Sequence, residues 1–251
     1  MSRVQPQTEA RFVTALVQRL GHRLPTGRAA RTTRLRNFGE VCSRFGVTCA
    51  AKALAYRLAK RWCNLQVADV LVQSVAQLAT TPRLVTGLEY RWLTADEVRA
   101  YAWDPTNDLE AAMAPDLENG RSYCCAAFDG AVLANYCWYA LDSIGSEHSL
   151  GAGLSFPSDS VYFYKAYTHP AYRGRGVYPT ALHHAASFFA ERGVSRLIAI
   201  VEYANWASFR SHAKLGFRLA GRFVKVGRQP LRFERYPQLA NTLGIRFGAK
   251  P

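Results

Sequence analysis

The stretch from Val161 to Phe189 constrains the fold of this chain more than any other. Val161–Thr168 is a run of β-branched and aromatic residues, which predicts one strand. His169-Pro170 ends that strand, because proline has no N–H to donate to a sheet. Arg173-Gly174-Arg175-Gly176 follows, and apolar residues then recur at helical spacing from Val177 to Phe189. The unit is therefore a strand, a glycine-rich turn and a helix.

The glycine-rich turn can bind an anion. Gly174 and Gly176 have no Cβ, so the backbone there can come close to a ligand. The amides at the start of a helix have no partner within the helix, and the helix dipole favours negative charge beside them. Arg173 and Arg175 add positive charge, which would suit a diphosphate. Many strand–turn–helix units contain glycines and bind no anion, so the turn by itself leaves that alternative open.

A second unit of strand and helix follows the first. Arg196–Val201 predicts a buried strand, and Asn205 opens a helix. Asn205, Ser208 and His212 share one face of that helix, because they lie at positions i, i+3 and i+7. Gly216 follows the helix where a left-handed cap is expected.

Together the two units resemble the acyl-CoA-binding half of the GCN5-related N-acetyltransferases, the GNAT superfamily. The family pattern is R/Q-x-x-G-x-G/A after a strand, followed about thirty residues later by N-x6-Y-x-K-x-G-F. The residues that match it are Arg173, Gly176, Asn205, Lys214, Gly216 and Phe217. The resemblance implies an α/β (α+β) fold with a mixed, mainly antiparallel central sheet flanked by helices.

The resemblance also implies a co-substrate, which is acetyl-CoA or another acyl-CoA, and no metal. The amides of the turn would hold the diphosphate, and the end of the preceding strand would pair with the pantetheine arm. The residues expected to bind the cofactor are Ala166, Tyr167, Thr168, Arg173, Gly174, Arg175, Gly176, Val177, Tyr178, Asn205 and Ser208.

Two residues depart from the family pattern, and two are candidates for catalysis. Tyr178 stands where the family has Gly or Ala. His212 stands where the family usually has the tyrosine that protonates the leaving thiolate, and imidazole can serve as that acid. The alternative is a packed or solvated helix histidine. Glu202, at the end of the second strand, is the expected base, and its alternative is a capping or salt-bridging residue.

Charge divides the chain into two parts. Residues 1–85 contain 14 Lys and Arg against 3 Asp and Glu, and so carry +11 of the net charge of +14. Apolar residues at helical spacing from Arg36 to Leu78 predict that residues 1–85 are a basic helical extension. The resemblance implies that residues 86–251 are a GNAT acyltransferase domain. The basic surface is either an ordinary solvated face or a docking surface for an anionic partner. Such a partner could be an acyl-carrier protein, a membrane surface or RNA.

Short apolar runs predict the rest of the second part. Asp129-Gly130 is a hairpin signal between two of the runs. Asn107–Leu117 is expected to be a helix, and Asp142–Asp159 a loop with two further candidate bases, Glu147 and His148. The expected strands are Leu88–Leu93, Ser122–Phe128, Ala131–Tyr139, Leu219–Val226 and Leu231–Tyr236.

The expected compartment is the cytoplasm, and the expected activity is acyl transfer. The six cysteines form no CxxC pair or metal-ligand spacing, no apolar run approaches the roughly 20 residues of a membrane span, and the N-terminus has no signal-like apolar region. We expect a CoA-dependent N-acetyltransferase whose acceptor is a primary amine of a small-molecule or biosynthetic substrate, which attacks directly. The alternatives are an acyltransferase that uses carrier-bound or long-chain donors at a membrane surface, and a non-catalytic binding module of the same fold.

Overall fold

A computed structural model gives the fold and describes residues 39, 41–80, 85, 87–145, 153–228 and 231–248. The described residues form two compact units. The first unit holds the described residues up to Leu65, together with Tyr203–Trp206 and Val226–Phe233. The second unit holds the remainder, and it contains every candidate site residue except Asn205. Glu147 and His148 lie outside the described residues.

The main element of the first unit is helix α3, Val47–Cys63, so the helical prediction is confirmed for this segment. The helix contains no acidic residue, and Lys60 and Arg61 lie in its last turn, where the helix dipole favours positive charge. Its buried residues are Ala50, Ala53 and Tyr56, and the Tyr56 ring packs edge-on against Tyr203 at 5.3 Å. Trp62 is 80% exposed.

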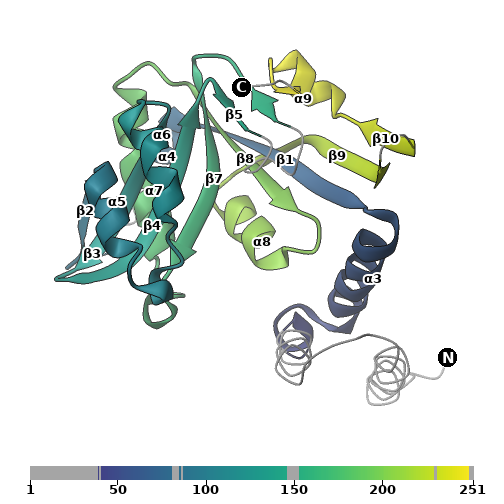
Figure 1. Ribbon diagram of the computed structural model, residues 1–251, viewed down its shortest axis with the longest axis horizontal. Coiled ribbons are helices and arrows are strands. Elements are labelled where there is room, and N and C mark those ends of the chain that lie inside the picture. The colour runs from purple at the N-terminus through teal and green to yellow at the C-terminus, as the bar shows by residue number, and fades with distance from the viewer. Residues whose placement is uncertain are drawn as a thin grey trace. The chain divides into compact units, whose positions relative to one another are not determined.

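The described chain contains an eight-stranded sheet with the order β10-β9-β1-β8-β7-β4-β3-β2 (Figure 1), and the second unit holds all of it except the residues within Val226–Phe233. Among the pairs whose register is described, only β7 with β8 is parallel. The strands are β1 (Gln66–Ser74), β2 (Glu89–Trp92), β3 (Ser122–Asp129), β4 (Val132–Leu141), β7 (Ser160–Thr168), β8 (Arg196–Glu202), β9 (Arg218–Arg228) and β10 (Leu231–Arg235). A small sheet joins β5 (Ser143–Ile144), β6 (Leu154–Ser155) and β11 (Arg246–Phe247). The mixed, mainly antiparallel sheet agrees with the predicted fold class.

Helices cover both faces of the large sheet. Helix α7 (Val177–Ala190) buries its apolar side against β3, β4, β7 and β8. Helices α5 (Ala95–Tyr101) and α6 (Ala114–Glu118) pack against the other face of β3 and β4. The other helices are α4 (Val75–Ala79), α8 (Trp206–Lys214), α9 (Gln238–Thr242), and the short 3-10 turns Pro105–Asn107, Ala111–Met113 and Pro170–Tyr172.

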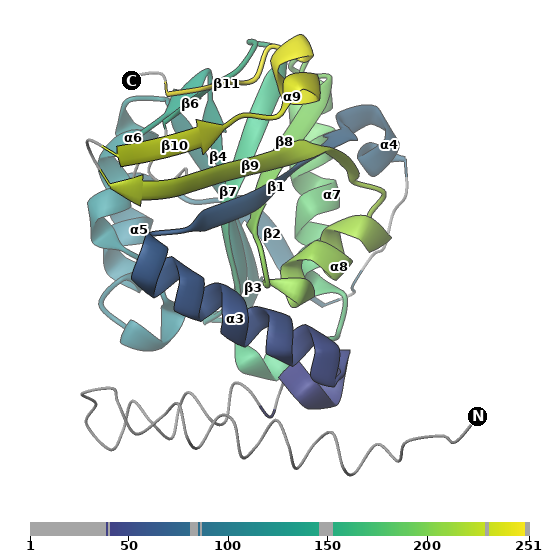
Figure 2. The same ribbon diagram turned by 90° about the vertical axis from the view of Figure 1, so that its right-hand side faces the viewer.

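Strand β1 overturns part of the sequence interpretation. The helix expected to continue to Leu78 is wrong between Gln66 and Ser74, which form a strand between β8 and β9 (Figure 2). Both neighbours pair with β1 along its length, and four consecutive residues from Ala68 to Leu71 are buried. A strand that is buried on both faces loses the alternation of polar and apolar residues, so its pattern resembles a buried helix. Residues 66–79 therefore belong with the sheet, although the sequence placed them in the extension.

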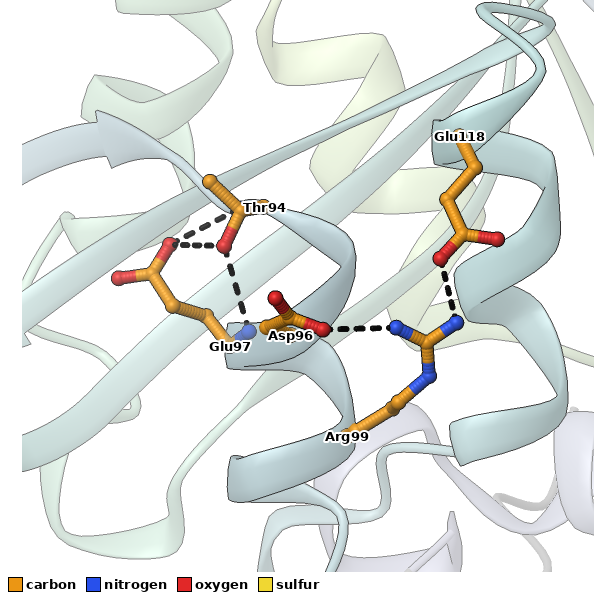
Figure 3. A network of polar contacts seen from close by, with 5 residues as sticks. All are labelled: Thr94, Asp96, Glu97, Arg99 and Glu118. Carbon is orange, nitrogen blue, oxygen red and sulfur yellow. Dashed lines mark hydrogen bonds and ion pairs between the residues drawn. The ribbon is translucent and has the colours of Figure 1, made fainter.

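A capping box fixes the start of helix α5 (Figure 3). Thr94 caps the helix by accepting from the Glu97 amide, and the Glu97 carboxylate accepts in return from the Thr94 amide. Arg99 then joins α5 to α6, because its guanidinium contacts Asp96 at 2.8 Å and Glu118 at 2.5 Å. The helix expected over Asn107–Leu117 is instead two 3-10 turns and the short α6, because Asp108 has a left-handed backbone and Pro115 begins a new helix.

The cysteines and the helices of the described chain add three further observations. All six cysteines are free thiols, and Cys124, Cys125 and Cys137 are buried. Within the described ranges, no group of three His, Cys, Asp or Glu side chains comes together as a metal-ligand set. No helix in the described part of the chain is both long enough and apolar enough to span a membrane.

Candidate active site

The parallel strands β7 and β8 separate partway along their length. Their described register runs only from Ser160 with Arg196 to Phe163 with Ala199. Beyond this point β7 continues to Thr168, still paired with β4, and β8 continues to Glu202, still paired with β1. An irregularity in the β4–β7 register leaves Tyr164 as an extra residue, and bulges bend strands. Helix α8 lies at the end where the strands separate (Figure 1).

The register shows which backbone N–H and C=O groups of β7 point away from β4, toward the side where β8 has separated. The His169 amide donates to the Ala134 carbonyl at 2.9 Å, so this pair is hydrogen-bonded. Hydrogen-bonded and non-bonded pairs alternate in antiparallel sheets, and the bonds therefore recur between Tyr136 and Tyr167. The amides and carbonyls of Ala166 and Thr168 consequently point away from β4. Of the three strand residues predicted to bind pantetheine, Tyr167 directs its amide into the sheet, and the other two offer theirs to a ligand.

Asn135 supports this end of β7 from the neighbouring strand. Its side chain is fully buried, and its amide donates to the Tyr167 carbonyl and, at 3.0 Å, to the Thr168 hydroxyl. The Cys137 thiol donates to its carbonyl oxygen at 3.6 Å. The sequence interpretation missed Asn135. A single polar residue within the otherwise apolar run from Val132 to Leu141 is the signal that could have identified it.

The glycine-rich turn has the geometry that the sequence predicts. Gly174 and Gly176 have φ of +78° and +82°, and Gly176 directly precedes α7. Within the described chain, the amides of Gly174, Gly176, Val177 and Tyr178 have no hydrogen-bond acceptor. They lie at the positive end of a 14-residue helix, which favours an anion. The Val177 side chain is buried, so only its backbone can reach a ligand.

The two arginines of the turn differ in what they contact. Arg173 reaches back to the strand, where its Nε donates to the Thr168 carbonyl at 3.0 Å. This contact joins the turn to the open half of β7. The Arg175 guanidinium lies 5.5 Å from the centre of the Tyr172 ring. Both arginines are exposed, so their remaining donors face solvent.

Tyr178 and His212, the two departures from the family pattern, are in contact. The Tyr178 hydroxyl lies 3.3 Å from His212 Nε2. His212 Nδ1 lies 2.8 Å from the Ser208 carbonyl and 3.4 Å from the Ser208 hydroxyl. The His212 side chain is 3% exposed and packs against Phe163 and Phe217. Burial lowers the pKa of His212, although its bond to the Ser208 backbone opposes this, and burial raises the pKa of Tyr178 well above its usual value.

Glu202 and Asn205 both precede α8, which begins at Trp206. Glu202 ends β8. Ile198 and Ile200 pack on the face of the sheet opposite α7, so strand alternation places Glu202 on that face too. Asn205 directly precedes α8 and belongs to the first unit, and its part in cofactor binding stays a prediction.

Comparison with known proteins assigns the family. A model of the acetyltransferase (GNAT) family matches residues 86–217, which is more than half of the chain. The chain belongs to the GNAT acetyltransferase family. The resemblance inferred from the turn and the second helix is therefore confirmed at the level of the family. A comparison with curated proteins gave no match.

Several solved structures resemble this GNAT protein at low identity. A GCN5-related N-acetyltransferase from Kribbella flavida has a TM-score of 0.48 at 16% identity, over 70% of this chain and 64% of that chain. A GCN5-related N-acetyltransferase from Sphaerobacter thermophilus has a TM-score of 0.46 at 14% identity, over 72% of this chain and 56% of that chain. AAC(6')-Iy, in complex with a CoA bisubstrate analogue, has a TM-score of 0.41 at 16% identity, over 52% of this chain and 90% of that chain. The chain covers less than two thirds of the first two structures.

The residues present fit acetyl-CoA, the co-substrate of the GNAT family. Among the described residues, a Cβ built at Gly176 would have only the Val85 side chain within 4 Å, at 3.5 Å, so these residues do not fill the turn. The unpaired amides of the turn suit a diphosphate, and the free edge of Ala166 and Thr168 suits an amide-containing arm. Both features lie on one continuous segment of the chain.

Proposed function

We propose that this protein transfers acetyl from acetyl-CoA to a primary amine of a small-molecule or biosynthetic substrate by direct attack. The observation that carries the proposal is the link between two ligand-binding features. Arg173 joins the four unpaired amides of the turn to the free edge of β7. Acetyl-CoA, when bound, supplies an activated thioester acetyl group.

The backbone of the turn and of β7 would hold this co-substrate. The amides from Gly174 to Tyr178 would neutralise the diphosphate, with Arg173 and Arg175 adding charge. Ala166 and Thr168 would pair with the pantetheine arm as an added strand does. One of these two amides, rather than that of Tyr167, would polarise the thioester carbonyl, because the register directs the Tyr167 amide toward β4. Ser208 would contact the arm from the start of α8, and a contact from Asn205 is expected from the family pattern alone.

Glu202 is the proposed base, and for His212 an acid role and a packed, positioning role are alternatives. Glu202 would take a proton from the attacking amine, directly or through water, and its place at the end of β8 supports this. For the acid role, His212 would have to be protonated at Nε2 as well and to pass that proton by way of its hydrogen-bonded partner Tyr178, because the imidazole is buried. Glu202→Gln should lower kcat, because the amide cannot take up the proton of the attacking amine. An unchanged kcat would contradict the assignment.

The acceptor would approach along the loop that precedes α6. This loop is joined to β7 by two contacts, the Tyr167 hydroxyl donating to the Thr106 carbonyl at 2.6 Å and Lys165 pairing with Glu110 at 2.6 Å. Asp104, Asp108 and Glu110 are exposed on the same loop. Exposed carboxylates beside the free edge of β7 support an amine that carries positive charge in solution.

The experiment is a screen of primary amines with acetyl-CoA, following release of the CoA thiol and identifying the product by mass spectrometry. The proposal predicts acetylated product from at least one cationic amine. Thiol release without acetylated amine would mean hydrolysis and would contradict the proposed acceptor class.

A second candidate keeps acyl transfer but changes the donor to an acyl-carrier protein. The observation that favours it is α3, a 17-residue helix with four basic residues, no acidic residue and an exposed Trp62, because carrier proteins are acidic. The test compares acetyl-CoA with acetylated carrier protein in wild type and in Arg57→Ala/Arg61→Ala. If the variant loses activity with the acetylated carrier protein but not with acetyl-CoA, the second candidate is supported. If the wild type and the variant use the carrier donor equally well, it is contradicted. Binding to anionic vesicles or RNA would instead favour those partners.

A further inference from the structure

Tyr178 and His212 tie the start of α7 to α8. Tyr178 lies in the first turn of α7, and its own amide is one of the four unpaired donors of the glycine-rich turn. His212 lies near the end of α8, 34 residues later. The hydrogen bond between their side chains therefore connects the turn that faces the co-substrate to a second helix.

The hydrogen-bond partners of His212 define which way this bond runs. A carbonyl oxygen can only accept, so Nδ1 carries the proton that is donated to Ser208. Nε2 is then an acceptor, and the Tyr178 hydroxyl is the donor at 3.3 Å. Burial keeps both groups uncharged, since it lowers the pKa of the imidazole and raises the pKa of the phenol. The result is a neutral donor and acceptor whose roles are fixed.

The bond lies at the point where β7 and β8 separate. The Phe163 ring is 6.0 Å from the Tyr178 ring and 5.7 Å from the His212 ring. Phe163 is also the last residue of β7 in the described register with β8. The three rings therefore pack together where the free edge of β7 begins.

We infer that Tyr178 and His212 act as a pair of positioning residues for acetyl-CoA binding. The bond holds the first turn of α7 so that its amides face the diphosphate. This inference rests on the proposed function, because it needs the turn to bind the co-substrate. When only a fraction of the protein molecules has the binding-competent conformation, the apparent affinity for the ligand is reduced by that fraction. Breaking the bond lowers that population and weakens binding, whereas loss of a proton donor would slow the chemical step.

The test is a double-mutant cycle measured by calorimetric titration with acetyl-CoA. Tyr178→Phe removes only the hydroxyl, and His212→Phe removes the acceptor. Each should raise the Kd for acetyl-CoA by about three- to tenfold, the effect of one hydrogen bond. The double variant should bind no more weakly than either single variant, because the two changes break the same bond. His212→Gln, which retains an acceptor, should bind more tightly than His212→Phe.

Kinetics and a matched control distinguish positioning from other roles. The inference predicts a raised KM for acetyl-CoA with kcat largely unchanged. A lowered kcat with an unchanged Kd would overturn it and return His212 to the role of acid. Tyr236→Phe removes a hydrogen-bonded hydroxyl from another part of the second unit and should leave the Kd unchanged.

The outcomes separate failure of this inference from failure of the proposed function. If the wild type does not bind acetyl-CoA, the proposed function is wrong. If the wild type binds and the effects of the two single variants multiply in the double variant, or if Tyr178→Phe binds as the wild type does, the positioning role is wrong. Thermal melting of each variant identifies loss of folding, and Tyr178→Phe keeps the test decisive if His212→Phe is unstable.

Discussion

Gly176 and Gly193 lie at opposite ends of helix α7 with nearly the same backbone conformation, φ +82° and +76°. Their surroundings are similar, because in the described part of the chain a Cβ at Gly193 would have no atom within 4 Å and one at Gly176 would meet only Val85, at the ordinary contact distance of 3.5 Å. Alanine at either position is strained by the backbone and not by its neighbours. The pair therefore separates the stability of α7 from its proposed part in binding acetyl-CoA.

We predict that Gly176→Ala and Gly193→Ala each destabilise the protein by about 1–2 kcal/mol, the cost of a left-handed conformation for a residue with a Cβ. Only Gly176→Ala should also weaken acetyl-CoA binding, because only Gly176 belongs to the turn. Urea unfolding and calorimetry measure the two effects. Equal weakening of binding by both changes would show that loss of helix stability, and not the turn, is responsible.

Asn135→Ala should lower both stability and turnover. The substitution removes the donors to Tyr167 and Thr168 and leaves buried polar groups unpaired, which costs about 1–3 kcal/mol. The free edge of β7 should then be held less firmly, so kcat/KM for acetyl-CoA should fall at a temperature where the variant is fully folded. Gln73→Ala is the control, because Gln73 is also buried and bonded to a backbone carbonyl, that of Leu215. A variant of Asn135 that loses stability but no activity would contradict the supporting role.

Stability should fall as the pH drops below the usual histidine pKa. Burial lowers the pKa of His212, so the unfolded chain takes up a proton at a higher pH than the folded chain does. Stability rises with pH wherever the unfolded state binds more protons, so this contribution is complete above a pH of about 6.5 and is lost as the pH falls toward the lowered pKa. Chemical unfolding at several pH values should show a smaller decline for His212→Phe than for wild type.

His184 contributes in the same direction, since burial and then its neighbour His183 lower its pKa. Some acid sensitivity should therefore remain in His212→Phe. An identical decline in wild type and variant would contradict the account of the buried imidazole.

The position of β1 in the sheet predicts how the protein responds to truncation at its N-terminus. A chain that begins at Leu65 keeps β1, whereas a chain that begins at Gly87 removes the strand between β8 and β9. We expect the first to retain a cooperative thermal transition and the second to lose it, because both neighbours would lose their hydrogen-bond partner. Circular dichroism during heating makes the comparison. A cooperative transition in the shorter chain would contradict a structural role for β1.

Local sequence patterns correctly predicted the helices and strands whose boundaries are set by residues next to them in the chain. The change from strand to helical spacing around Arg173 to Gly176 located β7, the turn and α7, because glycine and proline mark those boundaries. Periodicity failed for β1, because burial on both faces removes the alternation that distinguishes a strand. It also failed for Asn107–Leu117, where a left-handed Asp108 interrupts the helix.

The site was only partly predictable for a similar reason. The glycines of the turn are a local signal, and the turn that they form before the helix was expected from sequence. The contact between Tyr178 and His212 depends on how α7 and α8 pack on the sheet, and no pattern in either helix reveals it. Each residue by itself only departed from the family pattern. The structure shows that the two departures lie together.

The central claim is that the turn from Gly174 to Tyr178 binds the diphosphate of acetyl-CoA. Calorimetric titration of the wild type with acetyl-CoA and with S-acetylpantetheine tests it most directly, because the second ligand has the same thioester and arm but no diphosphate or nucleotide. The account predicts that S-acetylpantetheine binds at least about tenfold more weakly, since charge-assisted hydrogen bonds to the turn are missing. Equal affinity for the two ligands, or no binding of acetyl-CoA, would contradict it.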